Sequence, residues 1–133
     1  MAEEQKIMVK AIVEVLGSPK EHVEDTMKSV AEKIKDVFGV VSYNVYEAQE
    51  VQGLWSTFSE IEINFKNFDQ LIGFCFEYMP SSIEIIEPLS FNAKCTDMSN
   101  MINDLLAKIH RYDMVVKNMN AENVILKRKL DGK

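Results

Sequence analysis

Apolar residues recur along this chain with two different periods, and the order of these periods constrains the fold more than any other feature. From Ile7 to Leu16, the chain has a period of two and is rich in β-branched residues, which is typical of a β-strand. Spacings of three and four between apolar residues indicate helices elsewhere. The predicted strands cover residues 7–16, 41–46, 57–65 and 83–86. The predicted helices cover residues 19–38 and 68–79.

Boundary signals support these elements. Ser18, Pro19 and Glu21 combine an N-cap serine, a proline at the first helical position and a glutamate three residues after the cap. Asn67 and Gln70 form a second capping box of this kind. The stop signals are Gly17, Gly39, Pro80 and Pro88. Residues 47–55, with Gly53, are predicted to connect the second and third strands.

The order strand, helix, strand, strand, helix, strand is the split β-α-β pattern of an α+β protein. Residues 6–91 therefore resemble ferredoxin-like sandwiches, and more loosely the small-molecule-sensing ACT domains. The resemblance implies a four-stranded antiparallel sheet with both helices on one face, in which the first strand lies between the third and the fourth. It also implies a ligand-binding turn at 16–19, although capping of the helix explains the same four residues.

A second segment, residues 97–130, is predicted to be one long helix, because it contains no Gly or Pro. At ~1.5 Å per residue, about 34 residues span roughly 50 Å. In heptads, nine of the ten seam positions are apolar. The a positions are Ile102, Ile109, Val116, Asn123 and Leu130, and the d positions are Met98, Leu105, Tyr112, Met119 and Leu126.

Asn123 is the polar exception in this seam. A single Asn at an a position fixes the register and favours a parallel dimer, because it pairs with its own symmetry mate. Across such a dimer, Lys108 would face Asp113 and Glu122 would face Lys127. The sequence therefore favours a homo-oligomer, with a dimer preferred. The alternative is that the helix, mainly its first half, packs on its own domain.

The sheet face opposite the two short helices offers a second candidate surface. The alternation predicts Ile12, Tyr46, Phe58 and Ile86 on this face, together with four glutamates, and such a surface suits a protein partner. The glutamates would repel a phosphate backbone, so nucleic-acid binding there is not expected. The basic cluster 127–129 complements the dipole at the end of the long helix.

Residues for catalysis or metal binding are sparse. His22 and His110 have neither the spacing of a metal pair nor a nucleophile nearby, so both are expected at the surface. Cys75 and Cys95 lack C-x-x-C spacing and are expected to be reduced thiols. No phosphate-binding loop or hydrolase motif occurs in the sequence. We therefore expect that the protein is not an enzyme and that it has no catalytic site, no metal site and no cofactor.

The length and net charge of the chain indicate its number of domains and its location. A chain of 133 residues is long enough for one domain with a single core. The formal net charge of −6, the acidic N-terminus and the absence of long apolar runs favour a cytoplasmic protein without membrane contact. The predicted function is a noncatalytic protein-interaction module. The alternatives are a regulatory domain of ACT-like type, with a metabolite near Gly17 or residues 47–55, and a nucleic-acid-associated protein.

Overall fold

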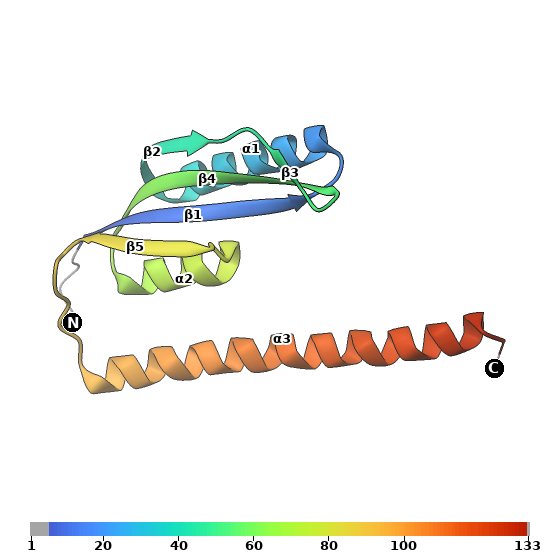
Figure 1. The fold of residues 1–133 in the computed structure, drawn as a ribbon. Helices are drawn as coiled ribbons and strands as arrows, with labels where there is room; N and C mark the ends of the chain where they lie inside the picture. Colours follow the sequence, from blue (N-terminus) through green and yellow to red (C-terminus); the bar gives the residue numbers. More distant parts are fainter. Residues whose placement is uncertain (1–5, 133) are drawn as a thin grey trace. The chain divides into compact units, whose positions relative to one another are not determined.

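The structure is a computed structural model that describes residues 6–132, and these residues fall into two compact units divided between residues 90 and 91 (Figure 1). In the first unit, the elements are β1 (Ile7–Gly17), α1 (Lys20–Val37), β2 (Gly39–Val45), β3 (Gln49–Val51), β4 (Leu54–Phe65), α2 (Phe68–Tyr78) and β5 (Ser82–Glu87). The second unit contains α3 (Cys95–Leu130), which begins two residues before the predicted position. The chain is thus an α+β protein with a long C-terminal helix.

The sheet is antiparallel, with the strand order β2-β4-β1-β5 and the short β3 paired with β4 (Figure 1). The first strand therefore lies between the two strands predicted to flank it. Ile7 pairs with Phe65 and Gly17 with Trp55, so β1 and β4 pair along the whole length of β1. This long ladder is the centre of the sheet.

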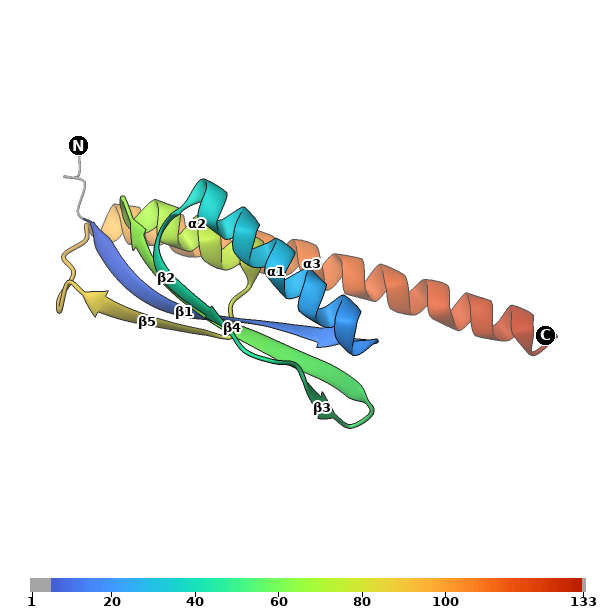
Figure 2. The same cartoon turned by 90° about the horizontal axis from the view of Figure 1, so that it is seen from above.

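Both short helices cover the same face of the sheet, as predicted (Figure 2). Alternate residues of β1 and β4 are buried there, because successive side chains of a strand point to opposite faces. Ile34 of α1 and Leu71 and Phe74 of α2 join the same core cluster. The remaining buried members are Ile7, Val9, Ala11, Val13, Ile61, Ile63 and Phe65.

Helix α2 begins as its sequence predicts. The Asn67 side chain accepts a hydrogen bond from Gln70 N at 2.8 Å, and the Gln70 side chain accepts one from Lys66 N at 2.8 Å. The helix ends where Met79 adopts a left-handed conformation, with φ 46°, just before Pro80. Side chains thus satisfy one backbone donor of the first turn, Gln70 N, and one just before the N-cap, Lys66 N, which stabilises this helix end.

The predicted capping box of α1 is wrong. The N-cap residue is Pro19, and no side chain caps this helix. Because α1 begins at Lys20, Ser18 lies one position too early to accept from the first turn. Pro19 O instead accepts the first helical hydrogen bond, from Val23 N at 3.1 Å.

Within the connection predicted for residues 47–55, the structure contains a hairpin that was not predicted, formed by β3 and the start of β4. Gln52 and Gly53 both have positive φ, 51° and 83°, as a two-residue type I′ turn requires. Strand β4 therefore begins at Leu54, three residues before the predicted start at Thr57. A turn of this type matches the twist of the strands that it joins.

Candidate interaction surfaces

The face of the sheet opposite α1 and α2 is called here the outer face. Ile12 lies between the buried Ala11 and Val13, and Phe58 lies between the buried Thr57 and Ser59, so both project to the outer face. Ile86 lies at the register shift of the β1–β5 pair and is 38% exposed. The alternation therefore predicted the positions of Ile12 and Phe58, whereas Ile86 stands at an irregularity of the ladder and its place on this face stays a prediction.

Tyr46 completes this group of predicted residues. Its ring stacks on Phe58, with the ring centroids 4.5 Å apart and the planes inclined by 23°. Tyr46 N also donates to Phe58 O at 3.0 Å, which continues the ladder past the end of β2. Each ring is about two fifths exposed. The stacked pair is thus a preformed aromatic surface on the outer face.

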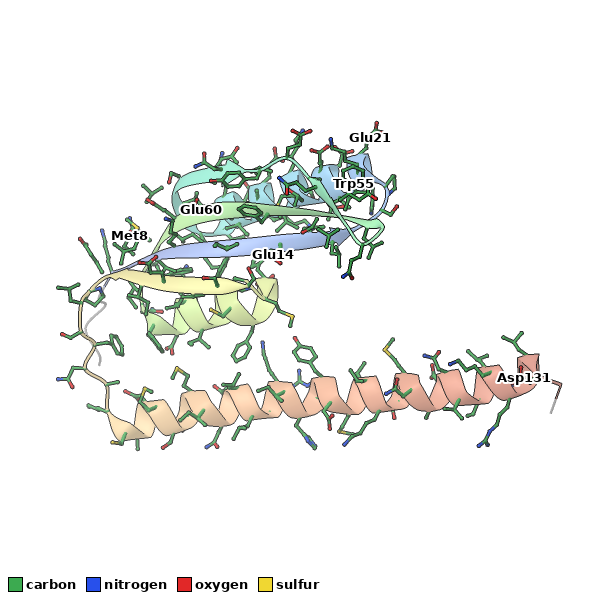
Figure 3. The ribbon with its side chains drawn as sticks, viewed as in Figure 1. Met8, Glu14, Glu21, Trp55, Glu60 and Asp131 are labelled. Carbon is green, nitrogen blue, oxygen red and sulfur yellow. The ribbon has the colours of Figure 1, made fainter. Side chains whose placement is uncertain are left out.

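Beside these rings, an ion pair joins β1 to β4. Lys10 Nζ lies 2.6 Å from Glu60 Oε1, and the Tyr46 hydroxyl donates to Glu60 Oε2 at 3.2 Å. The hydrogen bond from Lys10 lowers the pKa of Glu60, and the same bond raises the pKa of Lys10. Figure 3 labels Glu60 on β4 and Glu14 on β1.

The sequence analysis missed three apolar residues of this face. Leu16, Val51 and Leu54 are 61%, 50% and 42% exposed. Leu16 has the same parity as Ile12 in β1, and Leu54 has the same parity as Phe58 in β4, so alternation places both on the outer face. Val51 pairs with Leu54 across the hairpin. Recognition of the Gln52-Gly53 turn would have revealed this pair.

The two positions at which the resemblance implied a ligand make contacts within the chain. A Cβ added at Gly17 would lie 3.4 Å from a Val23 side-chain carbon. In the connection, Ala48 is buried, and its backbone N donates to Glu24 Oε2 of α1 at 3.3 Å. Lys20 joins α1 to the connection through Glu47, 2.8 Å away.

The two histidines lie on different helices, and so do the two cysteines. His22 lies on α1 of the first unit and His110 on α3 of the second. Cys75 and Cys95 are free thiols, and partial burial raises the pKa of Cys75. Within residues 6–132, no cluster of three or more His, Cys, Asp or Glu side chains could hold a metal ion.

Helix α3 has an unusual pattern of exposure. None of its 36 residues, all described by the structure, is buried. Along the predicted seam, exposure ranges from 36% at Met98 to 86% at Leu130, and Asn123 is also exposed. The predicted interface residues in this set are Ile102, Leu105, Ile109, Tyr112, Val116, Met119, Asn123, Leu126 and Leu130. The apolar side chains of this seam are therefore accessible to solvent along the whole of α3.

The charged side chains at the two ends of α3 have the signs that stabilise the helix dipole. Asp97 lies in the first turn, and Lys127, Arg128 and Lys129 lie in the last turn, as expected. Asp113 Oδ2 lies 2.9 Å from Lys117 Nζ one turn later on the same helix. The pairing of Lys108 with Asp113 across a dimer stays a prediction, and so does that of Glu122 with Lys127.

No helix in the described part of the chain is long and apolar enough to cross a bilayer.

Fold and surfaces together define an α+β protein with an antiparallel sheet, two short helices on one face of that sheet and a long C-terminal helix. The model of the MJ0538 family matches residues 8–133, and the chain belongs to that family. It is 33% identical over 106 residues to "Uncharacterized protein MJ0538" of Methanocaldococcus jannaschii. The match covers 77% of this chain and 39% of that protein, so the chain spans about two fifths of its relative's length. No solved structure matches the chain.

Proposed function

We propose that this chain is a noncatalytic protein-interaction module, a ferredoxin-like sandwich that self-associates through α3 as a parallel dimer. The strand order β2-β4-β1-β5 with two helices on one face supports the ferredoxin-like description. The observation that carries the function is the exposed apolar seam along α3. The cytoplasmic location and the ligand-sensing and nucleic-acid alternatives stay predictions.

The seam supports association because helices in water gain most of their stability from burying an apolar stripe. Ile109, Val116 and Met119 are each more than half exposed. Pairing with a second copy would cover them, at about 25 cal/mol for each Å² of apolar surface removed from water. A seam with a seven-residue repeat winds naturally into a left-handed two-stranded coiled coil.

Asn123 gives this dimer its register. In a parallel pair the two Asn123 amides face each other and satisfy their hydrogen bonds, whereas a slip by one heptad would place Asn123 against Val116 or Leu130. An unsatisfied buried amide costs about 1–3 kcal/mol, so the slipped alignments are disfavoured.

The proposal is tested by the molar mass of the full chain in solution, measured by light scattering at micromolar concentrations. We expect the mass of a dimer. Met119→Lys places a charge in the seam at a d position and should yield a monomer. Met114→Lys makes the same change at an f position, which faces away from the seam, and should leave the dimer intact.

Asn123→Ile is the second variant. It should raise the melting temperature of the oligomer, because the seam buries more apolar surface. It should also allow oligomers other than a dimer, because the seam loses the polar residue that selects the dimer. A monomeric full chain, or equal effects of Met114→Lys and Met119→Lys, would refute self-association through this seam.

A further inference from the structure

One end of the outer face carries a continuous group of exposed apolar residues, which we call the apolar zone. It consists of Leu16, Tyr46, Val51, Leu54 and Phe58, each at least 40% exposed. They come from β1, the end of β2 and the β3–β4 hairpin, which the register brings together. An apolar group of this size on one face is typical of a protein-binding surface.

The other part of the outer face is acidic. This acidic zone consists of Glu60, Glu62 and Glu84, whereas the fourth glutamate of the face, Glu14, lies opposite Phe58 at the apolar zone. Glu62 and Glu84 pair with Lys10 from its two sides, and the Lys10 amine is bonded to Glu60. Among the strand residues that the structure describes, Lys10 is the one base on this face. The four glutamates of the outer face therefore exceed its one lysine by three negative charges.

We infer that the outer face docks a partner protein that presents a basic amphipathic helix. The partner's apolar side chains would cover the stacked rings of Tyr46 and Phe58, and its lysines or arginines would meet Glu62 and Glu84. Charge complementarity selects this occupant, because a second outer face would bring like charges together and a phosphate backbone would be repelled. A helix is the element that sheets most often pack against in α+β proteins.

The dimensions of the face fit such a helix. From Leu54 in the apolar zone to Glu62 in the acidic zone, β4 advances eight residues, or about 26 Å at ~3.3 Å per residue. An α-helix of about 18 residues has the same length. One helix of five turns can therefore contact both zones at once, with apolar residues toward one end and basic residues toward the other.

The test uses the full chain and a fluorescent 18-residue probe peptide with leucines on one face and lysines at one end. Anisotropy gives the dissociation constant. We expect binding that weakens with added salt, because the contact between lysines and glutamates is partly exposed to solvent. A matched peptide with glutamate in place of every lysine should bind at least about tenfold more weakly.

Paired variants locate the binding site. Glu62→Gln/Glu84→Gln should weaken the probe about tenfold, and Leu54→Ser should weaken it independently of salt. Glu21→Gln/Glu32→Gln removes the same charge from exposed positions of α1 and should leave the affinity unchanged. All of these positions are solvent-accessible, so the fold should persist, and circular dichroism checks it.

Several results would overturn the inference. These are equal affinity for the acidic peptide, equal losses in the two double variants, or loss of binding in Met119→Lys alone, which would place the probe on α3. A fall in molar mass caused by Leu54→Ser would show that a second copy occupies the face instead. Self-association through α3 is judged by mass alone, so either proposal can fail while the other stands.

Discussion

Lys10 of β1 and Glu60 of β4 form an ion pair across the centre of the sheet, with Nζ and Oε1 2.6 Å apart. The hydrogen bond from Lys10 keeps the pKa of Glu60 below its usual value. A carboxyl group with a lower pKa in the folded state than in the unfolded state stabilises the fold when ionised. This stabilisation is fully present above the unfolded pKa and is lost as the pH falls through the folded pKa.

Glu60→Gln should therefore flatten the acid dependence of stability. The melting temperature of the unsubstituted protein should fall more steeply between about pH 5 and about pH 3 than that of the variant. Thermal melts followed by circular dichroism measure both. Glu14→Gln removes another carboxylate of the same face but keeps the Lys10–Glu60 pair, so it should retain the steeper fall. Parallel curves for all three proteins would contradict this prediction.

Two neighbouring hydroxyl groups in β4 should respond oppositely to removal. Thr57 and Ser59 are both completely buried, but the Thr57 hydroxyl donates to Tyr46 O, whereas Ser59 Oγ has no hydrogen-bond partner in the structure. Ser59→Ala should raise the free energy of unfolding by about 1 kcal/mol, and Thr57→Val should lower it by about 1 kcal/mol. Urea titration gives both values. Destabilisation by Ser59→Ala would show that this hydroxyl does have a partner in solution.

The two short helices should differ in their need for a capping side chain. Asn67→Ala removes the bond to Gln70 N and should cost about 1 kcal/mol of unfolding free energy. Ser18→Ala should change it by less than about 0.5 kcal/mol, because α1 has no side-chain cap. The same urea titrations compare the pair. Equal costs would mean that Ser18 caps α1 after all.

A third pair of variants tests the hairpin turn. Gly53 and Gly73 both have open space where a Cβ would lie, but Gly53 has φ 83° and Gly73 lies within α2. Gly53→Ala should cost about 1 kcal/mol, since L-residues with a side chain disfavour the left-handed region. Gly73→Ala should instead stabilise by about 0.5–1 kcal/mol, because alanine favours a helix. Thermal melts of the two variants should therefore shift in opposite directions.

Much of the sheet could be predicted from the sequence because burial on one face imposes a period of two. Val9 and Ala11 are buried and Lys10 is not, so the pattern of β1 is visible in the residues themselves. The same logic placed Ile12 and Phe58 on the outer face. The long helix was equally predictable, because a seam without Gly or Pro specifies both its length and its apolar side.

Other features depend on geometry that the residue types leave open. Ser18 has the chemistry of a cap, but α1 begins one residue too late for its hydroxyl to reach a free N–H. Val51 and Leu54 become neighbours only through positive φ at Gln52, a conformation that glutamine adopts rarely. The orphan hydroxyl of Ser59 follows from the depth of β4 beneath the helices, which no local pattern encodes.

The central position of β1 has a consequence for synthesis of the chain. Its partners are β4 and β5, so the first strand to be made pairs with two strands that are made much later. While residues up to Val51 leave the ribosome, neither partner strand of β1 has been made. The backbone groups at both edges of β1 are then unpaired and exposed to other nascent chains. The sheet closes only when β5 has emerged. Until Glu87 has been made, β1 is open to pairing with the strands of other chains.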